Sequence, residues 1–290
     1  MDIIDTFWIY YNHVAIRKVG LGSIIRMARI SVLMGIYNCA TTLVEALDSL
    51  YAQTFHDFKV ILCDDGSTDN TYGIAKSYAE KHNNIVLVKN ERNMGLNFTL
   101  NHCLEYADTE YCARMDGDDI SLPTRFEKEI AFLDTHREYE IVSCPMIYFD
   151  EKGEFGKGHS EGEPRFSDII YGPPFCHAPC MVRTTAYKKV GGYTVDKRLL
   201  RYEDYNLWTK MYAEGFRGYN LGECLYAMRD DRNAAKRRSF KNRLNGIYAH
   251  YLAYKTLHLS TWGFIKYCVF SIIAGIVPIS IYNIIHKYRI

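Results

Sequence analysis

Three carboxylates fall within four residues, at Asp116, Asp118 and Asp119, directly after the apolar run 111–115. Carboxylates this close repel one another, and a fold tolerates them best when a cation neutralises them or water solvates them. A short apolar run that follows a helical pattern is typical of a buried strand, and ligands of open α/β sheets bind at strand carboxyl ends. The cluster therefore favours Mg²⁺ or Mn²⁺ holding a phosphate-bearing substrate, with a solvated Asp-Gly turn as the simpler alternative.

Two further acidic pairs precede predicted helices. Asp64 and Asp65 follow the apolar run 58–63, and Glu203 and Asp204 open a helical pattern. The simple interpretations are a turn with a helix N-cap for the first pair and a favourable helix dipole, about 0.3–1 kcal/mol per residue, for the second. The functional alternatives are a hydrogen bond to a nucleobase or ribose for the first pair and a general base near an acceptor for the second.

The strands and helices that position these groups alternate along the chain. Apolar, β-branched runs predict buried strands, and amphipathic patterns between them predict helices, two of which open with capping-box patterns (Thr42 with Glu45, and Thr124 with Glu127). The alternation predicts an α/β fold with a Rossmann-like, mostly parallel sheet and right-handed crossovers. The predicted strands are 30–36, 58–63, 85–88, 111–115 and 141–149.

Two familiar phosphate-binding signatures are absent from the sequence. No GxGxxG follows the first strand and no GxxxxGK[ST] occurs, so the dinucleotide and P-loop patterns do not apply. His177 stands alone in a Pro-rich loop over 173–180, where a structural hydrogen bond is the simple interpretation and ligand contact the alternative.

The net charge of +1 conceals an asymmetry, because residues 229–290 carry 11 Lys and Arg against 2 Asp and Glu. A basic, apolar tail behind an acidic body favours a membrane surface as partner and argues against nucleic acid. The run 267–285 is 19 residues long and uncharged, near the lower limit of about 17–25 residues for a membrane span. We expect membrane association there, and the pattern leaves open whether the segment spans or lies in the plane.

The cysteines and the first residues bear on location. Nine scattered cysteines, several inside apolar runs, indicate a reducing compartment with buried thiols. Residues 1–29 form an amphipathic extension, or else native translation begins at Met27. We therefore expect a protein at the cytoplasmic face of the plasma membrane, either peripheral or held by a single C-terminal anchor.

Taken in order, the motifs resemble family 2 glycosyltransferases with the A-type nucleotide-sugar fold, of the bacterial surface-polysaccharide type. The block at 114–123 with 125–128 resembles that family's metal-binding Asp-x-Asp block. The resemblance covers roughly 30–230, and its other motifs are 34–38, Gln53-Thr54, 64–69, 93–95 with Asn101, His177, 181–183, 191–193 and 203–208.

The resemblance implies a role for each matching residue. Asp65 contacts the nucleobase, and Asp118 binds the metal that bridges the diphosphate. Asp116 supports the ribose or sugar side and is the second metal residue. Asp204 is the general base, and Glu203 orients it or contacts the acceptor. The departures are Gly35, where many relatives have Pro, Thr or Ser, Asp119 after the metal aspartate, and Asn206 where Asp is frequent. The implied nucleotide-sugar site comprises Gly35, Ile36, Tyr37, Asn38, Asp65, Asn93, Arg114, Asp116, Gly117 and His177.

The implied activity is metal-dependent, inverting transfer of one sugar from a nucleoside-diphosphate sugar, with UDP favoured. The acceptor would be a hydroxyl of a glycan or polyprenyl-diphosphate-linked glycan in capsule or O-antigen synthesis. A polyprenyl-phosphate sugar synthase and a nucleotide-sugar-binding protein without turnover are the alternatives. The expected organisation is an N-terminal extension (1–29), a nucleotide-sugar half (30–120), an acceptor and catalytic half (121–230) and a membrane-associating tail (231–290).

Overall fold

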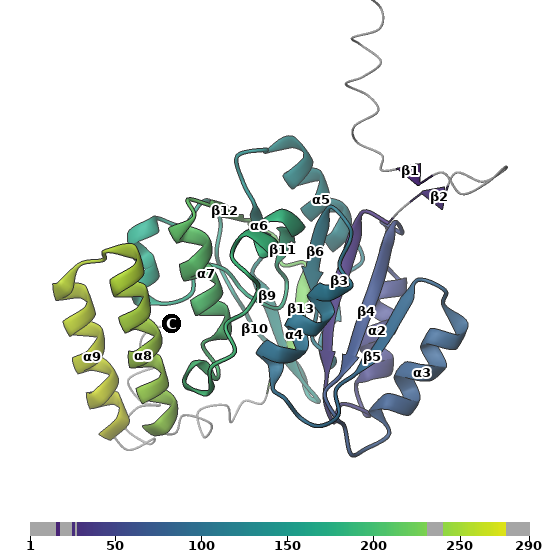
Figure 1. Ribbon diagram of the computed structural model, residues 1–290, viewed down its shortest axis with the longest axis horizontal. Coiled ribbons are helices and arrows are strands. Elements are labelled where there is room, and N and C mark those ends of the chain that lie inside the picture. Colours follow the sequence, from purple (N-terminus) through teal and green to yellow (C-terminus); the bar gives the residue numbers. More distant parts are fainter. Residues whose placement is uncertain (1–15, 18–24, 27, 231–239, 277–290) are drawn as a thin grey trace, which may run out of the picture.

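The computed structural model describes residues 16–17, 25–26, 28–230 and 240–276 (Figure 1). Its centre is a seven-stranded sheet in the order β12-β8-β11-β6-β3-β4-β5. Strands β6, β3, β4 and β5 are mutually parallel, as predicted, whereas β11 runs antiparallel to both β6 and β8. The strands of this sheet are β3 (Ile30–Ile36), β4 (Phe58–Asp64), β5 (Ile85–Lys89), β6 (Tyr111–Arg114), β8 (Ile141–Ser143), β11 (Met181–Arg183) and β12 (Gly218–Asn220).

Helices cover both faces of this sheet, which confirms the α/β class. Successive side chains of a strand point to opposite faces, so Val32 and Met34 join one core and Leu33 joins the other. The first core is completed by α2 (Leu43–Tyr51), α3 (Thr71–Lys81) and α5 (Arg125–Thr135). The second is completed by α4 (Leu96–Glu105), α6 (Thr184–Lys189) and α7 (Glu203–Ala213).

A second, smaller sheet lies beside the first and corrects one predicted strand. The run 141–149 is two strands, because β8 ends at Ser143 and β9 begins at Met146, after Pro145. Proline has no N–H to donate to a sheet ladder, so the chain leaves the central sheet there. The second sheet has the order β10-β9-β13-β7, with β7 (Ile120–Ser121), β9 (Met146–Asp150), β10 (Gly153–Lys157) and β13 (Tyr226–Arg229).

Both capping-box patterns predict the helix starts correctly, but neither Thr42 nor Thr124 accepts a side-chain cap hydrogen bond from its helix. The Thr42 hydroxyl donates to the carbonyls of Cys39 (3.2 Å) and Gly117 (3.0 Å), and it accepts no cap hydrogen bond from an N–H of α2. The Glu127 carboxylate accepts a 2.6 Å hydrogen bond from the Thr54 hydroxyl. These side chains tie the helix ends to neighbouring loops, and in the case of Thr42 to the turn that carries the acidic cluster.

The chain continues in a helical hairpin, α8 (Phe240–Leu257) and α9 (Thr261–Ile276), with α8 between α7 and α9 (Figure 1). The His250 ring of α8 stacks between Tyr205 of α7 and Tyr267 of α9, at 4.3 and 3.4 Å between ring centroids. None of the helices in the described part of the chain is long and apolar enough to cross a membrane. Most of the predicted extension 1–29, the alternative start Met27 and positions 277–285 of the apolar run lie outside the described residues.

Candidate active site

The predicted site residues gather at the carboxyl edge of β3, β4 and β6. In the parallel register Gly35 pairs with Cys63 and Ile36 with Asp64, and the Asp65 amide donates to the Ile36 carbonyl at 2.9 Å. On the other side of β3, Leu33 pairs with Arg114, two residues before Asp116. The sheet therefore brings the ends of three sequence motifs to one edge, as the predicted topology requires.

The three carboxylates of the acidic cluster meet in space. Each of Asp116, Asp118 and Asp119 offers one oxygen, and these oxygens all lie within 4.8 Å of one another. Burial and the charge of Asp116 raise the pKa of Asp118, and burial with the charges of both neighbours raises the pKa of Asp119 to about 8. The raised pKa values reflect lost hydration first and mutual repulsion second, and a bound cation would relieve the repulsion.

Arg114 neutralises one member of this cluster. Its guanidinium is 4% exposed and donates two hydrogen bonds to Asp116, at 2.6 and 2.5 Å. The Arg114 carbonyl in turn accepts a 2.9 Å hydrogen bond from the fully buried Arg125, which also forms an ion pair with buried Glu129. The end of β6 is therefore held from both sides, and Asp116 has a fixed orientation.

Two residues from the distant strand β13 hold the rest of the turn. The Asp116 amide donates to the Tyr226 hydroxyl at 3.2 Å, and the Arg229 amide donates to Asp119 at 2.8 Å. The Arg229 guanidinium donates to the Asp118 carbonyl at 3.1 Å and forms an ion pair with Glu45. The sequence gives no sign of Tyr226 in this role, and Arg229 is recognisable there only as one of several basic residues.

The donor set fits a hard divalent cation. Asp118 is exposed, while Asp116 is half-buried against Arg114 and Asp119 is 2% exposed. Mg²⁺ and Mn²⁺ take carboxylate oxygens and usually keep positions for water or phosphate oxygens. An exposed carboxylate beside two restrained ones suits such an ion, with Asp118 as the direct ligand and Asp116 in support.

Asp65 is at the same edge, and its carboxylate is already partly engaged. It is 5% exposed and accepts hydrogen bonds from the Asn90 side chain (2.8 Å), the Met94 amide (2.8 Å) and the Gly95 amide (2.9 Å). It therefore anchors the start of α4, and not the start of α3, where a local N-cap would lie. A carboxylate has about four acceptor positions, so one remains for a base N–H.

The neighbouring loops bring Asn93 and Asn38 to the same edge of the sheet. A Cβ on Gly66, whose φ is +72°, would lie 2.8 Å from the Asn93 nitrogen, so the two backbones touch above Asp65. Asn38 adopts a left-handed φ of 49° and its side chain accepts a 2.8 Å hydrogen bond from the Thr68 amide. Tyr37 beside it is 45% exposed, which leaves its ring available at the rim.

Gly117 lets the acidic turn pack closely against the end of β3 and the loop that follows it. A Cβ there would lie 2.8 Å from the Cys39 sulfur and 3.1 Å from Ile36 Cγ2. By contrast, a Cβ on Gly35 would meet Thr99 and Leu96 of α4 at 3.1 and 3.3 Å. Gly117 thus permits close approach within the site, whereas Gly35 permits helix packing against the sheet.

Glu203 and Asp204, the predicted base residues, lie in the first turn of α7. Burial and the charge of Asp204 raise the pKa of Glu203 to about 7, and burial raises the pKa of Asp204. The positive charge of Arg114 lowers both pKa values and therefore acts on the α7 carboxylates as well as on Asp116. Arg114 links the acidic cluster to the predicted general base.

His177 is placed by a hydrogen bond, as its simpler interpretation predicts. Its Nε2 is 2.8 Å from the Tyr193 hydroxyl, and Tyr193 is fixed through its backbone by the Asn101 side chain (2.7 and 2.8 Å). Burial and then the charge of Arg114 lower the pKa of His177 well below its usual value. A neutral His177 thus joins the loop 173–180 to the segment 191–193.

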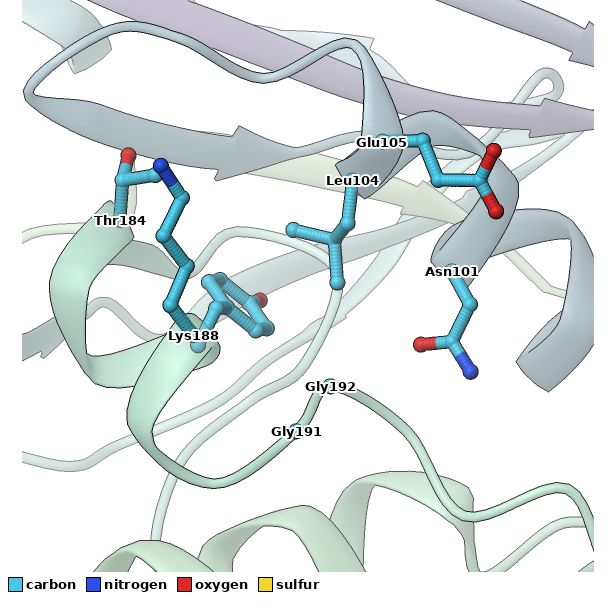
Figure 2. A pocket seen from close by; sticks show the side chains of 8 residues that line it. Asn101, Leu104, Glu105, Thr184, Lys188, Gly191 and Gly192 are labelled. Atoms are coloured by element: carbon cyan, nitrogen blue, oxygen red, sulfur yellow. The ribbon is translucent and has the colours of Figure 1, made fainter.

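A surface pocket of about 300 Å³ lies elsewhere, between α4 and α6 (Figure 2). Thr184 opens α6 directly after Arg183, which pairs with Tyr111 at the amino end of β6. The pocket is therefore at the opposite edge of the sheet from the acidic cluster. It is lined by Asn101, Leu104, Glu105, Thr184, Tyr187, Lys188, Gly191 and Gly192, none of which is among the predicted site residues.

Comparison with known proteins agrees with this geometry. Residues 31–191 match the family described as glycosyl transferase family 2. The protein EpsE of Bacillus subtilis (strain 168), which is named as a glycosyltransferase, is 43% identical over 90% of this chain and 94% of its own length. A galactosyltransferase of Escherichia coli, named UDP-Gal:alpha-D-GlcNAc-diphosphoundecaprenol beta-1,3-galactosyltransferase, is 31% identical over 89% of this chain and 95% of its own length.

A solved structure supports the fold independently. The mannosyltransferase PcManGT of Pyrobaculum calidifontis, in complex with GDP-Man and Mn²⁺, superposes with a TM-score of 0.60. It is 18% identical and covers 91% of this chain and 81% of its own, which is evidence for the A-type fold alone. With the family match over 31–191 and the two relatives, the conclusion is direct: this chain belongs to the family 2 glycosyltransferases.

Proposed function

We propose that this glycosyltransferase transfers one sugar, with inversion, from a UDP-sugar to a hydroxyl of a lipid-diphosphate-linked glycan in bacterial surface-polysaccharide synthesis, and that it requires Mn²⁺ or Mg²⁺. One observation carries the proposal: the oxygens of Asp116, Asp118 and Asp119 meet within 4.8 Å at the carboxyl edge of the sheet, with Asp116 fixed by buried Arg114. A diphosphate leaving group needs such a cation site, and an attacking hydroxyl needs a base, for which the carboxylates of Glu203 and Asp204 are the candidates.

The donor end of the proposal rests on the residues around Asp65. The remaining acceptor position of this carboxylate suits the N–H of uracil, and the backbone at Ile36 and the exposed Tyr37 flank it. A UDP donor and a lipid-diphosphate acceptor are also named for the Escherichia coli relative. The metal, when bound, offsets the negative charge that develops on the departing diphosphate.

The chemical step assigns each residue of this chain a distinct task. Asp118 faces the diphosphate, and Asp116, fixed by Arg114, faces the ribose or sugar. Asp204 accepts the proton of the acceptor hydroxyl as its oxygen bonds to the anomeric carbon and the bond to the diphosphate oxygen breaks. A single displacement inverts the anomeric centre. Glu203 beside Asp204 contacts the acceptor or orients the base.

Titration calorimetry of UDP with Mn²⁺ and with EDTA, beside product formation from UDP-sugars, tests this assignment. We expect Asp118→Ala to lose Mn²⁺-dependent UDP binding. Asp204→Asn should keep that binding and lower turnover by about 10²–10⁴-fold, the usual contribution of a general base. The matched control is Asp108→Asn, a carboxylate that is 62% exposed and paired with Lys59.

The outcomes separate the alternatives. Unchanged turnover in Asp204→Asn would favour a phosphate acceptor, which needs little help from a base, as in a polyprenyl-phosphate sugar synthase. Metal-dependent UDP binding without any product would indicate a binding protein without turnover. If UDP, GDP and dTDP all fail to bind, the cation site itself is refuted.

A further inference from the structure

The outward side of α9 carries a continuous set of large apolar side chains, called here the α9 face: Trp262, Ile265, Val269, Phe270, Ile272 and Ile273. They are between 44% and 64% exposed. At 100° per residue they fall within an arc of about 160° on one side of the helix. The opposite side faces the protein, because Ser271 is buried and Tyr267 stacks on His250.

The helix that carries the α9 face packs against the body of the protein. The hairpin is fixed to the body by the Tyr205–His250–Tyr267 stack and by the contact of Gly263 with Ile170, where an added Cβ would lie 3.4 Å from Cγ1. Figure 1 places α9 at the outer edge of the molecule, beyond α8. An exposed apolar surface on a rigidly held helix indicates a binding surface, because soluble proteins seldom leave such patches uncovered.

The charge of the C-terminal part of the chain indicates which surface the α9 face meets. Lys266 lies within the face, with its Nζ 5.4 Å above the Trp262 ring, and Lys255 of α8 lies 5.6 Å above the Tyr251 ring. No Asp or Glu occurs after Asp231, whereas residues 232–290 contain ten Lys and Arg. Aromatic rings paired with lysines beside an apolar helix face are typical of helices that lie in the headgroup region of anionic membranes.

We infer that the α9 face docks in the plane of an anionic lipid bilayer and holds the catalytic helix beside the lipid surface. The first part stands on the α9 face alone. The second rests on the proposed function, since a lipid-linked acceptor is what the catalytic helix would meet there.

The α9 helix is connected to the start of α7 through α8. A Cβ on Gly246 of α8 would lie 2.5 Å from the Tyr202 hydroxyl and 2.8 Å from the Tyr267 hydroxyl, so all three helices meet at this point. Tyr202 immediately precedes Glu203. Since α8 lies between α7 and α9 and the α9 face is on the outer side of α9, the face is about two helix diameters, roughly 20 Å, from the first turn of α7.

Flotation of the full-length protein with vesicles tests the inference. Phosphatidylcholine vesicles are compared with vesicles to which phosphatidylglycerol gives an anionic surface. We expect the wild type to float with the anionic vesicles, and Trp262→Glu/Phe270→Glu to float at least about tenfold less. Lys266→Glu should weaken binding by about fivefold or more and remove part of its salt dependence. Phe155→Glu, at a 40% exposed ring on β10, is the matched control and should float as the wild type does.

Tryptophan fluorescence locates the contact. The chain has three tryptophans, so the measurement is made in a Trp8→Phe background. Of the other two, Trp262 is 64% exposed and Trp208 is buried, so anionic vesicles should shift the emission to shorter wavelength, and adding Trp262→Phe should abolish the shift. A wild type that does not float, a double variant that floats equally well, or a shift that survives in Trp262→Phe would each overturn the inference. A wild-type dimer that the double variant converts to monomer would assign the face to a second copy of the chain and overturn it as well. Mn²⁺-dependent UDP binding, measured on the same samples, reports on the proposed function separately.

Discussion

Arg114 and Asp116 form a buried, two-bond ion pair across only two positions of the chain, at 2.6 and 2.5 Å. The positive charge of the same guanidinium also opposes part of the rise in pKa that burial imposes on Glu203 and Asp204. One cation therefore acts on the acidic cluster and on the carboxylates at the start of α7, and it is itself held through its carbonyl by Arg125.

Arg114→Lys is expected to lower the affinity for UDP with Mn²⁺ by about 10–100-fold. An ammonium group cannot reproduce two parallel hydrogen bonds, and a hydrogen bond to a charged group contributes about 1.5–3 kcal/mol. Calorimetric titration measures the affinity. Arg198→Lys is the control, because Arg198 makes the same paired contact with Asp196 at a spacing of two residues, with its side chain 63% exposed. Equal effects of the two substitutions would argue against a special role for Arg114.

Gly117→Ala should displace the acidic turn, because the new methyl group would lie 2.8 Å from the Cys39 sulfur and 3.1 Å from Ile36 Cγ2. We expect about a tenfold loss of Mn²⁺-dependent UDP affinity, since positioning errors below 1 Å already impair such sites. Cys39→Ala in the same chain removes the closer obstacle and should recover most of the loss. Gly158→Ala, where the nearest atom would be 3.4 Å away, is the control. A double variant no better than Gly117→Ala alone would refute the steric explanation.

His250 makes the docking of the C-terminal hairpin sensitive to acid. Burial lowers the pKa of His250 to about 4 from a usual value of 6.5, so between these values the unfolded chain binds more protons than the folded one. Stability is therefore full above pH 6.5 and falls as the pH drops towards 4, by about 3 kcal/mol for this group. Thermal unfolding followed by circular dichroism from pH 7 to pH 4 measures the effect.

The variant His250→Phe keeps a ring between Tyr205 and Tyr267 and removes the proton. Its melting temperature should depend less on pH over this range. His258→Asn, at an exposed position with a left-handed φ of 50°, should leave the pH dependence unchanged. A wild-type profile that is flat from pH 7 to pH 4 would contradict the assignment to His250.

The sequence predicts the parts of this fold that are locally encoded. The strands 30–36, 58–63 and 85–88 and the helices between them follow from apolar periodicity, and their carboxyl ends identify the binding edge. Strand β11 has only three residues, too few to show a period, and its antiparallel place between β6 and β8 depends on partners far along the chain.

The site was predictable where a residue type carries the chemistry and not where another residue positions it. Asp116, Asp118, Glu203 and Asp204 are evident from charge and spacing. Tyr226 contacts Asp116 from 110 residues away through a strand register that no local pattern specifies. The motif alone does not decide whether Asp65 caps α3 or α4. Its hydrogen bonds to the start of α4 depend on the tertiary structure.

The contacts of β13 also determine when, during synthesis, the acidic turn can reach its final structure. Strands β3 to β6 come from one stretch of chain joined by short crossovers, and can pair as they leave the ribosome. The bonds from Tyr226 to Asp116 and from Arg229 to Asp119 each span 110 residues. At about 5–20 residues per second, the acidic turn waits roughly 5–20 seconds for the strand that fixes it. A nascent chain thus carries its carboxylates long before it can hold them in the geometry that a substrate requires.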